Sequence, residues 1–320
     1  MKNIVLLFIF FVLIFACNKE KNFEEEIAKI PMDIKVERFD KLFGDMNLDK
    51  LPKLKQDYPF MFSKKYTDSF WIERAQDTMQ IKLQEEVFKV FPEFEEEQKD
   101  IKSLFQHIKF YFPEFKESRV ITMTSMIDYR SRVIVTDTIT LISIDSYLGS
   151  NHEFYQGIQK YIRVDFEKEH IVIDLAAEYA KKYIFQGENK TLLDEMIYSG
   201  KQLYFMDEVI PFKSEAERIS YSQEQLEWAN LNESYIWRYF VERELLFSTD
   251  SKLPGRFINP APFTKFYLEE IDSESPGRLG QYMGWQIVKA YMENNEVTLK
   301  EMLIKSPEEI FNNSKFKPRK

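Results

Sequence analysis

The chain has 320 residues, a net charge of −9 and 16% aromatic residues, with 29 Phe and 17 Tyr but only 9 Gly. An acidic balance without a basic stripe argues against a nucleic-acid partner. The single cysteine excludes an intrachain disulfide. Many aromatic residues and few glycines favour a helix-rich fold with a large aromatic core.

Residues 1–16 have the layout of a secretory signal. Lys2 is followed by an apolar run that is shorter than the roughly 20 residues of a membrane-spanning helix. The run leads directly into Cys17, and the stretch IFAC at residues 14–17 resembles a bacterial lipobox. The pattern therefore predicts cleavage before the cysteine.

We expect the Cys17 thiol to carry a diacylglyceryl thioether and the new N-terminus to be acylated, for example with palmitate. Two or three acyl chains anchor a protein stably, whereas one chain alone binds a membrane only marginally. The alternative is a buried thiol at the end of an uncleaved anchor. The predicted organisation is a lipoprotein signal peptide at 1–16, the acylated cysteine and a polar tether at 17–30, and one domain at 31–320.

The first half of this domain mixes helices and strands. Alternating apolar residues predict a strand at 32–40, and helical periodicity predicts helices at 70–91 and near 97–111. A proline in a repeated FPEF sequence ends each of these helices. Three stretches rich in Ile, Val and Thr then predict neighbouring strands in one antiparallel or mixed sheet, at 118–127, 131–137 and 138–148.

From about residue 152 the pattern is helical almost to the end. Ser222 and Gln225 form a predicted capping box that opens a long helix through about Phe247. A Pro/Gly-rich loop at 253–263 precedes a last pair of helices at 277–294 and 298–313. Strands in the first half and helices in the second predict a mostly helical α+β fold.

One short stretch is similar to the metal-binding helix of zinc peptidases. His152 and Glu153 begin an HExxH-like sequence, but Gln156 stands where the second histidine would be. Because Gly157 follows, a regular helix is not expected there. The favoured interpretation is a surface turn with the start of a helix.

A second candidate is a polar stripe at four-residue spacing, made by His170, Asp174, Glu178 and Lys182. Residues at this spacing lie on one helix face, where three of these side chains could hold a cation. The favoured alternative is a solvated stripe with i,i+4 pairs opposite a buried face of Ile, Leu, Ala and Tyr residues.

Gly280 and Gly284 form a GxxxG pattern in a predicted helix. This pattern mediates dimers of membrane helices, but no apolar stretch beyond the signal is long enough to span a bilayer. We therefore expect these glycines to let another backbone approach closely.

Several long segments together resemble one family, the gliding-motility lipoproteins called GldB, from Bacteroidota. They are the lipobox, YPFMF at 58–62, SYLGSNHEFYQG at 146–157, LLDEMIYSGKQLYFMDEVIP at 192–211 and PGRLGQYMGWQIVKAYMENN at 276–295. The resemblance covers essentially the whole chain. It implies a membrane-anchored protein that is required for gliding and has protein partners in the gliding machinery and its associated secretion apparatus.

The same segments more distantly resemble HExxH zinc peptidases. Ser199-Gly200 stands where those peptidases carry a Glu-Gly step, and Asp174 and Glu178 stand where two histidines are expected. The resemblance therefore implies a zincin-like fold without its zinc, acting as a scaffold, with no cofactor and no catalytic residue. The alternative is an atypical metal-dependent hydrolase or peptidase that uses His170, Asp174 and Glu178.

The residue that follows the cysteine bears on which membrane holds the anchor. Asn18 follows the cysteine, and it is not the Asp that retains lipoproteins at the inner membrane of enteric bacteria. We therefore expect the periplasmic face of the outer membrane in preference to the inner membrane.

Overall fold

A computed structural model describes residues 23–185, 187, 191–260 and 265–319. The predicted signal peptide at 1–16 and Cys17 lie outside these ranges. No helix within them combines the length and the apolar character needed to cross a membrane.

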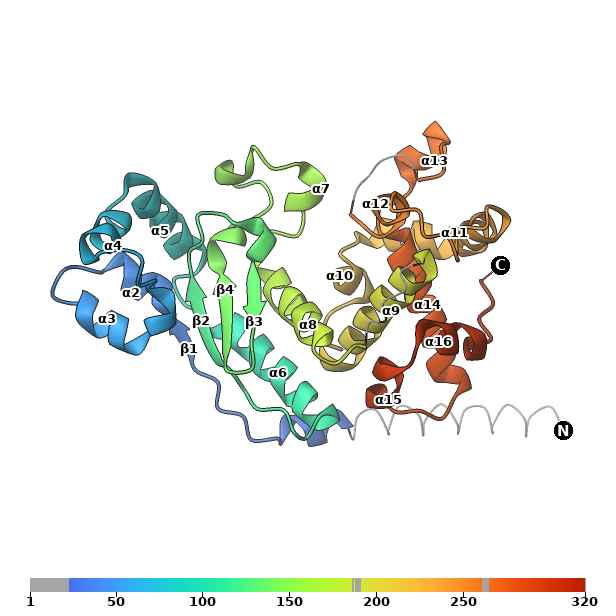
Figure 1. Ribbon diagram of the computed structural model, residues 1–320, viewed down its shortest axis with the longest axis horizontal. Helices are drawn as coiled ribbons and strands as arrows, with labels where there is room; N and C mark the ends of the chain where they lie inside the picture. Colours follow the sequence, from blue (N-terminus) through green and yellow to red (C-terminus); the bar gives the residue numbers. More distant parts are fainter. Residues whose placement is uncertain (1–22, 186, 188–190, 261–264, 320) are drawn as a thin grey trace, which may run out of the picture.

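The helices outnumber the strands along the chain (Figure 1). The strands are β1 (Val36–Arg38), β2 (Arg119–Met123), β3 (Val133–Val135) and β4 (Ile139–Ser143). The helices are α2 (Phe39–Gly44), α3 (Leu51–Asp57), α4 (Asp68–Ala75), α5 (Thr78–Val90), α6 (Glu95–Tyr111), α7 (Lys160–Arg163), α8 (Ile171–Lys181), α9 (Leu192–Val209), α10 (Glu215–Ile219), α11 (Gln223–Glu242), α12 (Leu253–Phe257), α13 (Glu269–Glu274), α14 (Leu279–Asn294), α15 (Leu299–Ile304) and α16 (Pro307–Ser314). Short 3-10 helices lie at Pro59–Met61, Tyr129–Ser131, Ile144–Ser146, Glu153–Tyr155 and Lys168–His170.

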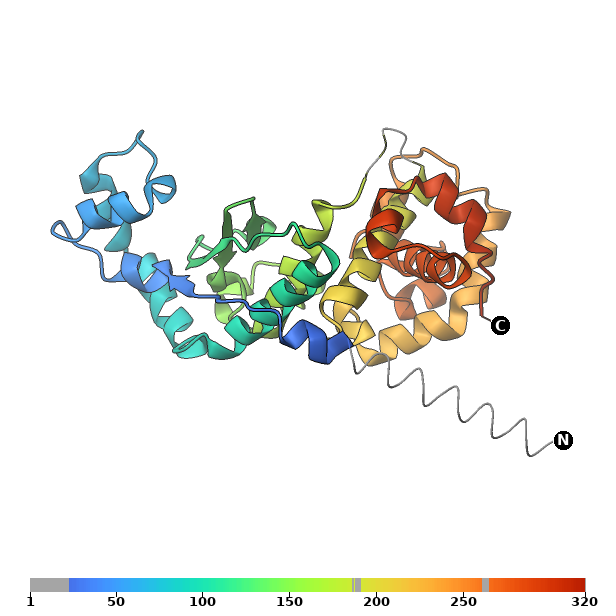
Figure 2. The same cartoon turned by 90° about the horizontal axis from the view of Figure 1, so that it is seen from below.

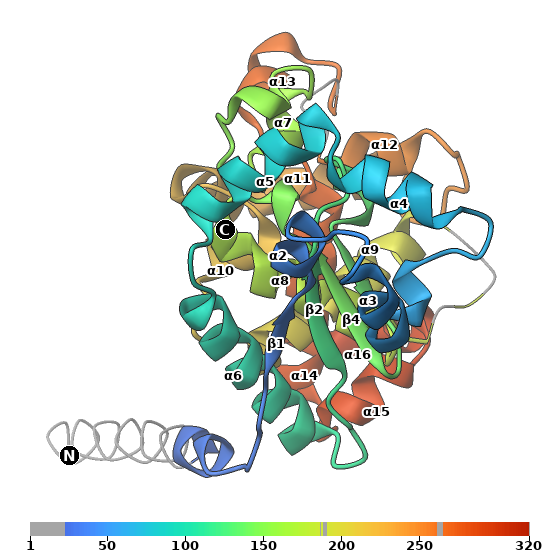
Figure 3. The same ribbon diagram turned by 90° about the vertical axis from the view of Figure 1, so that its left-hand side faces the viewer.

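The four strands form one mixed sheet in the order β1-β2-β4-β3. β1 and β2 are parallel, with Val36 opposite Val120, and β2 and β4 are also parallel, while β3 runs antiparallel to β4. Figure 3 shows this sheet from the side of α2 and α3. The structure therefore confirms the predicted mostly helical α+β architecture with a small mixed sheet in the N-terminal half.

Alternate residues along a strand pack into two different hydrophobic cores, one on each face of the sheet. Val120 belongs to the large core shared with α6, α8, α9 and α14, whereas its neighbour Ile121 belongs to a smaller core with Phe39 and Leu51. This division follows from the two-residue period of a strand. In Figure 1, α2 and α3 accordingly lie on one side of the sheet and α8 on the other.

Several predicted elements are shorter than expected, and local capping explains the breaks. The strand predicted at 32–40 ends at Arg38. The helix predicted at 70–91 is broken at Asp77, whose carboxylate accepts hydrogen bonds from two backbone N–H groups at the start of α5. The last predicted helix is similarly divided by Ser306, which caps α16, and by Pro307 in its first turn.

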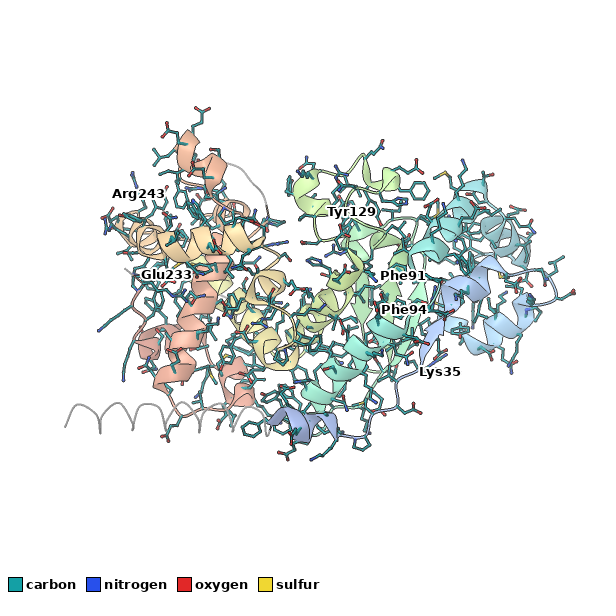
Figure 4. All side chains as sticks on the ribbon, turned by 180° about the vertical axis from the view of Figure 1, so that it is seen from behind. Lys35, Phe91, Phe94, Tyr129, Glu233 and Arg243 are labelled. Carbon is teal, nitrogen blue, oxygen red and sulfur yellow. The ribbon has the colours of Figure 1, made fainter. Side chains whose placement is uncertain are left out.

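The C-terminal half also corrects two boundaries. Ser222 and Gln225 form the expected capping box, but α11 ends at Glu242 rather than near Phe247. The loop predicted at 253–263 contains the short helix α12. In the middle of α11, Glu233, which is labelled in Figure 4, accepts hydrogen bonds from the Tyr282 hydroxyl and the Arg319 backbone N–H.

The first described residues pack against the body of the protein. Ile27 is buried, and Gln106 on α6 donates hydrogen bonds to the carbonyl oxygens of Ala28 and Ile30, at 3.2 and 2.8 Å. The ring of Phe23 lies 5.9 Å from that of Phe110. Residues 23–30, which form part of the predicted tether, are therefore held on α6, as the view from below shows (Figure 2).

Helices α9 and α14 cross at a point where both lack side chains. A Cβ atom placed on Gly284 would lie 1.8 Å from the carbonyl oxygen of Met196, and one on Gly200 would lie 2.3 Å from the carbonyl oxygen of Gly284. The expected close approach of a second backbone to the GxxxG pattern is therefore confirmed. Its partner is the helix that contains the Ser199-Gly200 step.

A buried carboxylate lies beside this crossing. Asp207 on α9 accepts a 2.7 Å hydrogen bond from the indole of Trp285 and pairs with Arg218 at 2.8 Å. Burial raises the pKa of Asp207 to about 6, against the opposing effects of Lys289 and Arg218. The folded state therefore favours the protonated form, so the stability that this group contributes is lost as the pH rises from about 4 to about 6.

We expect Asp207→Asn to remove this pH dependence. Between pH 4 and pH 7 the wild type should lose roughly 2 kcal/mol of unfolding free energy that the variant keeps, at about 1.4 kcal/mol per pKa unit. Urea unfolding at these two pH values measures the difference. The exposed Asp49→Asn serves as control, and parallel pH curves for Asp207→Asn and wild type would contradict the assignment.

Candidate functional site

Asp174 is the centre of a buried polar cluster rather than part of a solvated stripe. Its carboxylate pairs with Arg132 at 2.9 Å and accepts a 2.6 Å hydrogen bond from the Tyr147 hydroxyl. The side chains of Asp174 and Arg132 are 18% and 16% exposed. The expectation of a solvated stripe is therefore wrong for Asp174, because the segment that precedes β3 places Arg132 against this face of α8.

The surroundings of Arg132 fix its guanidinium group. It lies 5.6 Å from the ring centre of Tyr147 and 5.2 Å from that of Phe166. It also donates a 3.3 Å hydrogen bond to the carbonyl oxygen of Asp165. Burial raises the pKa of Asp174, while the charge of Arg132 and the hydrogen bond from Tyr147 oppose the rise.

A second ion pair extends the cluster to α14. Arg278 donates a 2.8 Å hydrogen bond to Asp165 and two more to the carbonyl oxygens of Ile219 and Ser220. The Nε2 atom of His170 lies 3.5 Å from the other oxygen of Asp165. Asp165 thus links the start of α8 to the start of α14.

The three predicted metal-ligand candidates are not brought together. His170 faces Asp165, Asp174 pairs with Arg132, and Glu178 pairs with Lys181 on its own helix. Within the described ranges, no group of three or more His, Cys, Asp or Glu residues is placed to hold a metal ion.

The other peptidase-like positions have structural roles. Ser199 and Gly200 lie buried in α9, at its crossing with α14. His152 precedes a single 3-10 turn and accepts a hydrogen bond from the backbone N–H of Phe154, which agrees with the expected turn. The turn is at the surface, with Glu153, Gln156 and Gly157 exposed, but the His152 side chain is only 13% exposed and lies 3.3 Å from Glu86.

A pocket of about 370 Å³ opens beside this cluster. Its walls come from Lys160, Tyr161 and Val164 around α7, and from the α10–α11 junction and the start of α14, including Tyr221 and Arg278. Arg278 is thus shared between the pocket and the Asp165 ion pair. Cationic and hydroxyl groups in such a wall can bind a polar ligand.

Sequence reasoning missed Arg132, Asp165, Tyr147 and Arg278, the residues that complete the cluster. Tyr147 and Arg278 lie within two of the family-like segments, so those segments signalled them indirectly. Arg278 has a left-handed backbone with φ of 58°, which is unusual for a residue with a side chain. No local pattern indicates that Arg132 and Asp174 would meet.

These features define a mostly helical α+β protein. Its residues at the peptidase-like positions take part in ion pairs and in helix packing. The family model described as "Gliding motility protein GldB" matches residues 20–318. The chain therefore belongs to the GldB family, as its segments suggested. This family implies a role in gliding motility, and its lipoprotein designation implies a lipid-anchored location in the cell envelope. No curated protein and no solved structure matches the chain, and the comparisons give the resemblance to zinc peptidases no support.

Proposed function

We propose that this protein is a non-catalytic scaffold of the gliding machinery and of its associated secretion apparatus, anchored through acylated Cys17. The observation that carries the proposal is the use of Asp174 in the buried pair with Arg132. A carboxylate that is engaged by a guanidinium and a tyrosine hydroxyl is not free to bind a metal or to take a proton from water. Partner binding, not chemistry, is then the function of the folded body.

We also propose that residues 31–320 form one domain with a zincin-like ancestry. One hydrophobic core that runs from the sheet through α8 and α9 to α14 supports the single domain. Helices α8 and α9 pack against each other and carry Asp174, Glu178, Ser199 and Gly200, which supports the ancestry. The proposed location is the periplasmic face of the outer membrane.

Replacing the proposed acylation site tests the anchor. We expect Cys17→Ser to abolish colony spreading, because an acidic body without acyl chains has no means of staying at the membrane. The measurement is complementation of a strain that lacks the chromosomal copy, with immunoblots of separated inner and outer membranes. Normal gliding with an unacylated protein would contradict the proposal.

A second variant separates the scaffold from a metal-dependent hydrolase. His170→Gln with Glu178→Gln removes two of the three candidate ligands and leaves the Arg132–Asp174 pair in place. A scaffold keeps its gliding activity with this double change, whereas a hydrolase that depends on these ligands loses it. Metal analysis of the purified wild-type lipoprotein provides the independent measurement.

A further inference from the structure

A second pocket lies at the carboxyl end of β2, on the face of the sheet away from α8. Its volume is about 260 Å³, and we call it the strand-end pocket. Its walls come from α2, α4, the start of α5 and the loop that follows β2. Because β1, β2 and β4 are parallel, the pocket lies just beyond the carboxyl ends of parallel strands, where α/β sheets generally bind ligands.

The loop that forms one wall has an unusual backbone. Met126 and Ile127 are consecutive residues with φ of 60° and 62°. This is the left-handed region, which residues other than glycine rarely adopt. The buried carboxylate of Asp145 holds this conformation by accepting hydrogen bonds from the backbone N–H groups of Ser125 and Ile127, at 3.0 and 2.8 Å. Strain that is maintained by buried hydrogen bonds is concentrated at binding sites.

Hydrogen-bond donors are in excess around the strand-end pocket. Trp71 lines it, and among the residues that the structure describes its buried indole nitrogen has no acceptor. The structure records no ion pair or hydrogen bond for the exposed guanidinium of Arg74 within the residues it describes. Thr124 accepts a 2.9 Å hydrogen bond from Gln80, so its own hydroxyl hydrogen remains available.

The other residues that line the strand-end pocket indicate what kind of hydrogen-bond acceptor it can bind. Phe39, Phe43, Met61 and Met123 supply an apolar surface. Asp128 also lines the pocket, and its negative charge disfavours a doubly charged ligand such as phosphate more strongly than a singly charged one. Unpaired donors beside an apolar wall fit a singly charged acceptor with an apolar tail.

We propose that the strand-end pocket binds a small monocarboxylic acid. The carboxylate accepts hydrogen bonds from the Arg74 guanidinium and the Thr124 hydroxyl, and the apolar tail contacts the side chains of Phe39 and Phe43 beside the Trp71 ring. This activity is separate from the scaffold function and does not depend on the Arg132–Asp174 cluster.

Indole NMR of the full lipoprotein in detergent tests the proposal. The chain contains 4 Trp, so ¹⁵N-indole labelling gives a simple spectrum in which Trp228→Phe, Trp237→Phe and Trp71→Phe assign the signals. We expect hexanoate to shift the Trp71 signal in a saturable way. At the same concentration, hexanol and inorganic phosphate should shift it much less, and hexanol also controls for partition into the micelle.

Arg74→Gln provides the quantitative arm, because the side chain is exposed and the change should not disturb the fold. We expect a loss of hexanoate affinity of about tenfold or more from the lost charge-assisted bond. Arg238→Gln, an exposed arginine on α11, should leave the affinity unchanged. An unshifted Trp71 signal, equal affinity in Arg74→Gln, or equal binding of hexanol would each overturn the proposal.

Discussion

Gly284→Ala is expected to destabilise the protein by about 3 kcal/mol or more, at or above the upper end for overpacked cores. The added methyl group would lie 1.8 Å from the carbonyl oxygen and 2.3 Å from the carbonyl carbon of Met196. Both atoms belong to the backbone of α9, so no side-chain rotation can relieve the overlap. The helices α9 and α14 would have to separate along their contact.

Gly255→Ala is the matched control. Gly255 lies in helix α12, and apart from its chain neighbours and the backbone of α12 no atom of the described residues lies within 4 Å of a Cβ atom placed on it. Because alanine favours helix by about 1 kcal/mol over glycine, this variant should be as stable as the wild type or slightly more stable. Urea unfolding followed by circular dichroism measures both variants. If Gly284→Ala lost less than about 1 kcal/mol of unfolding free energy, the contact between α9 and α14 would be looser than these distances imply.

The second large effect is expected at the buried pair of Arg132 and Asp174. Arg132→Met leaves a buried carboxylate that keeps, among the described residues, the hydrogen bond from the Tyr147 hydroxyl, and such a change costs about 3 kcal/mol or more. Burial already raises the pKa of Asp174, and removing the cation raises it further. The variant should therefore lose more stability as the pH rises, and regain part of it where Asp174 becomes protonated.

A double-mutant cycle isolates the pair. Asp174→Asn keeps an acceptor for Tyr147 but leaves Arg132 without its anion, so this single change is also costly. The double variant Arg132→Met with Asp174→Asn should lose much less than the sum of the two, with a coupling of about 2 kcal/mol or more. Lys53→Met, in the exposed pair with Asp57, should have almost no effect. Additive losses would show that the two side chains do not depend on each other.

The features that could be predicted from sequence are those with local causes. Alternation and helical periodicity correctly predicted the mixed α+β composition, and the capping box at Ser222 follows from residues three positions apart. The breaks at Asp77 and at Ser306-Pro307 have equally local causes, an N-cap and a first-turn proline. The N-cap and the first-turn proline are therefore sufficient to place the starts of α5 and α16.

The candidate site could not be predicted because its contacts are distant in the sequence. The four-residue spacing placed Asp174 and Glu178 on one face of α8, but only the folded chain brings Arg132 against the first of them. In the same way, the GxxxG spacing predicted a close approach without identifying the partner. That partner is helix α9, at Met196 and at Gly200, and Gly200 belongs to the step that the zinc-peptidase resemblance aligns with a ligand position.

The packing of residues 23–30 on α6 limits how far the body can stand from the bilayer. Six peptide units join Cys17 to Phe23, and at full extension they reach only about 20 Å. With Cys17 acylated, the end of α6 that holds Phe23 stays within that distance of the lipid headgroups. A partner of this protein is then encountered close to the membrane surface, because so short an anchor keeps the body beside the bilayer.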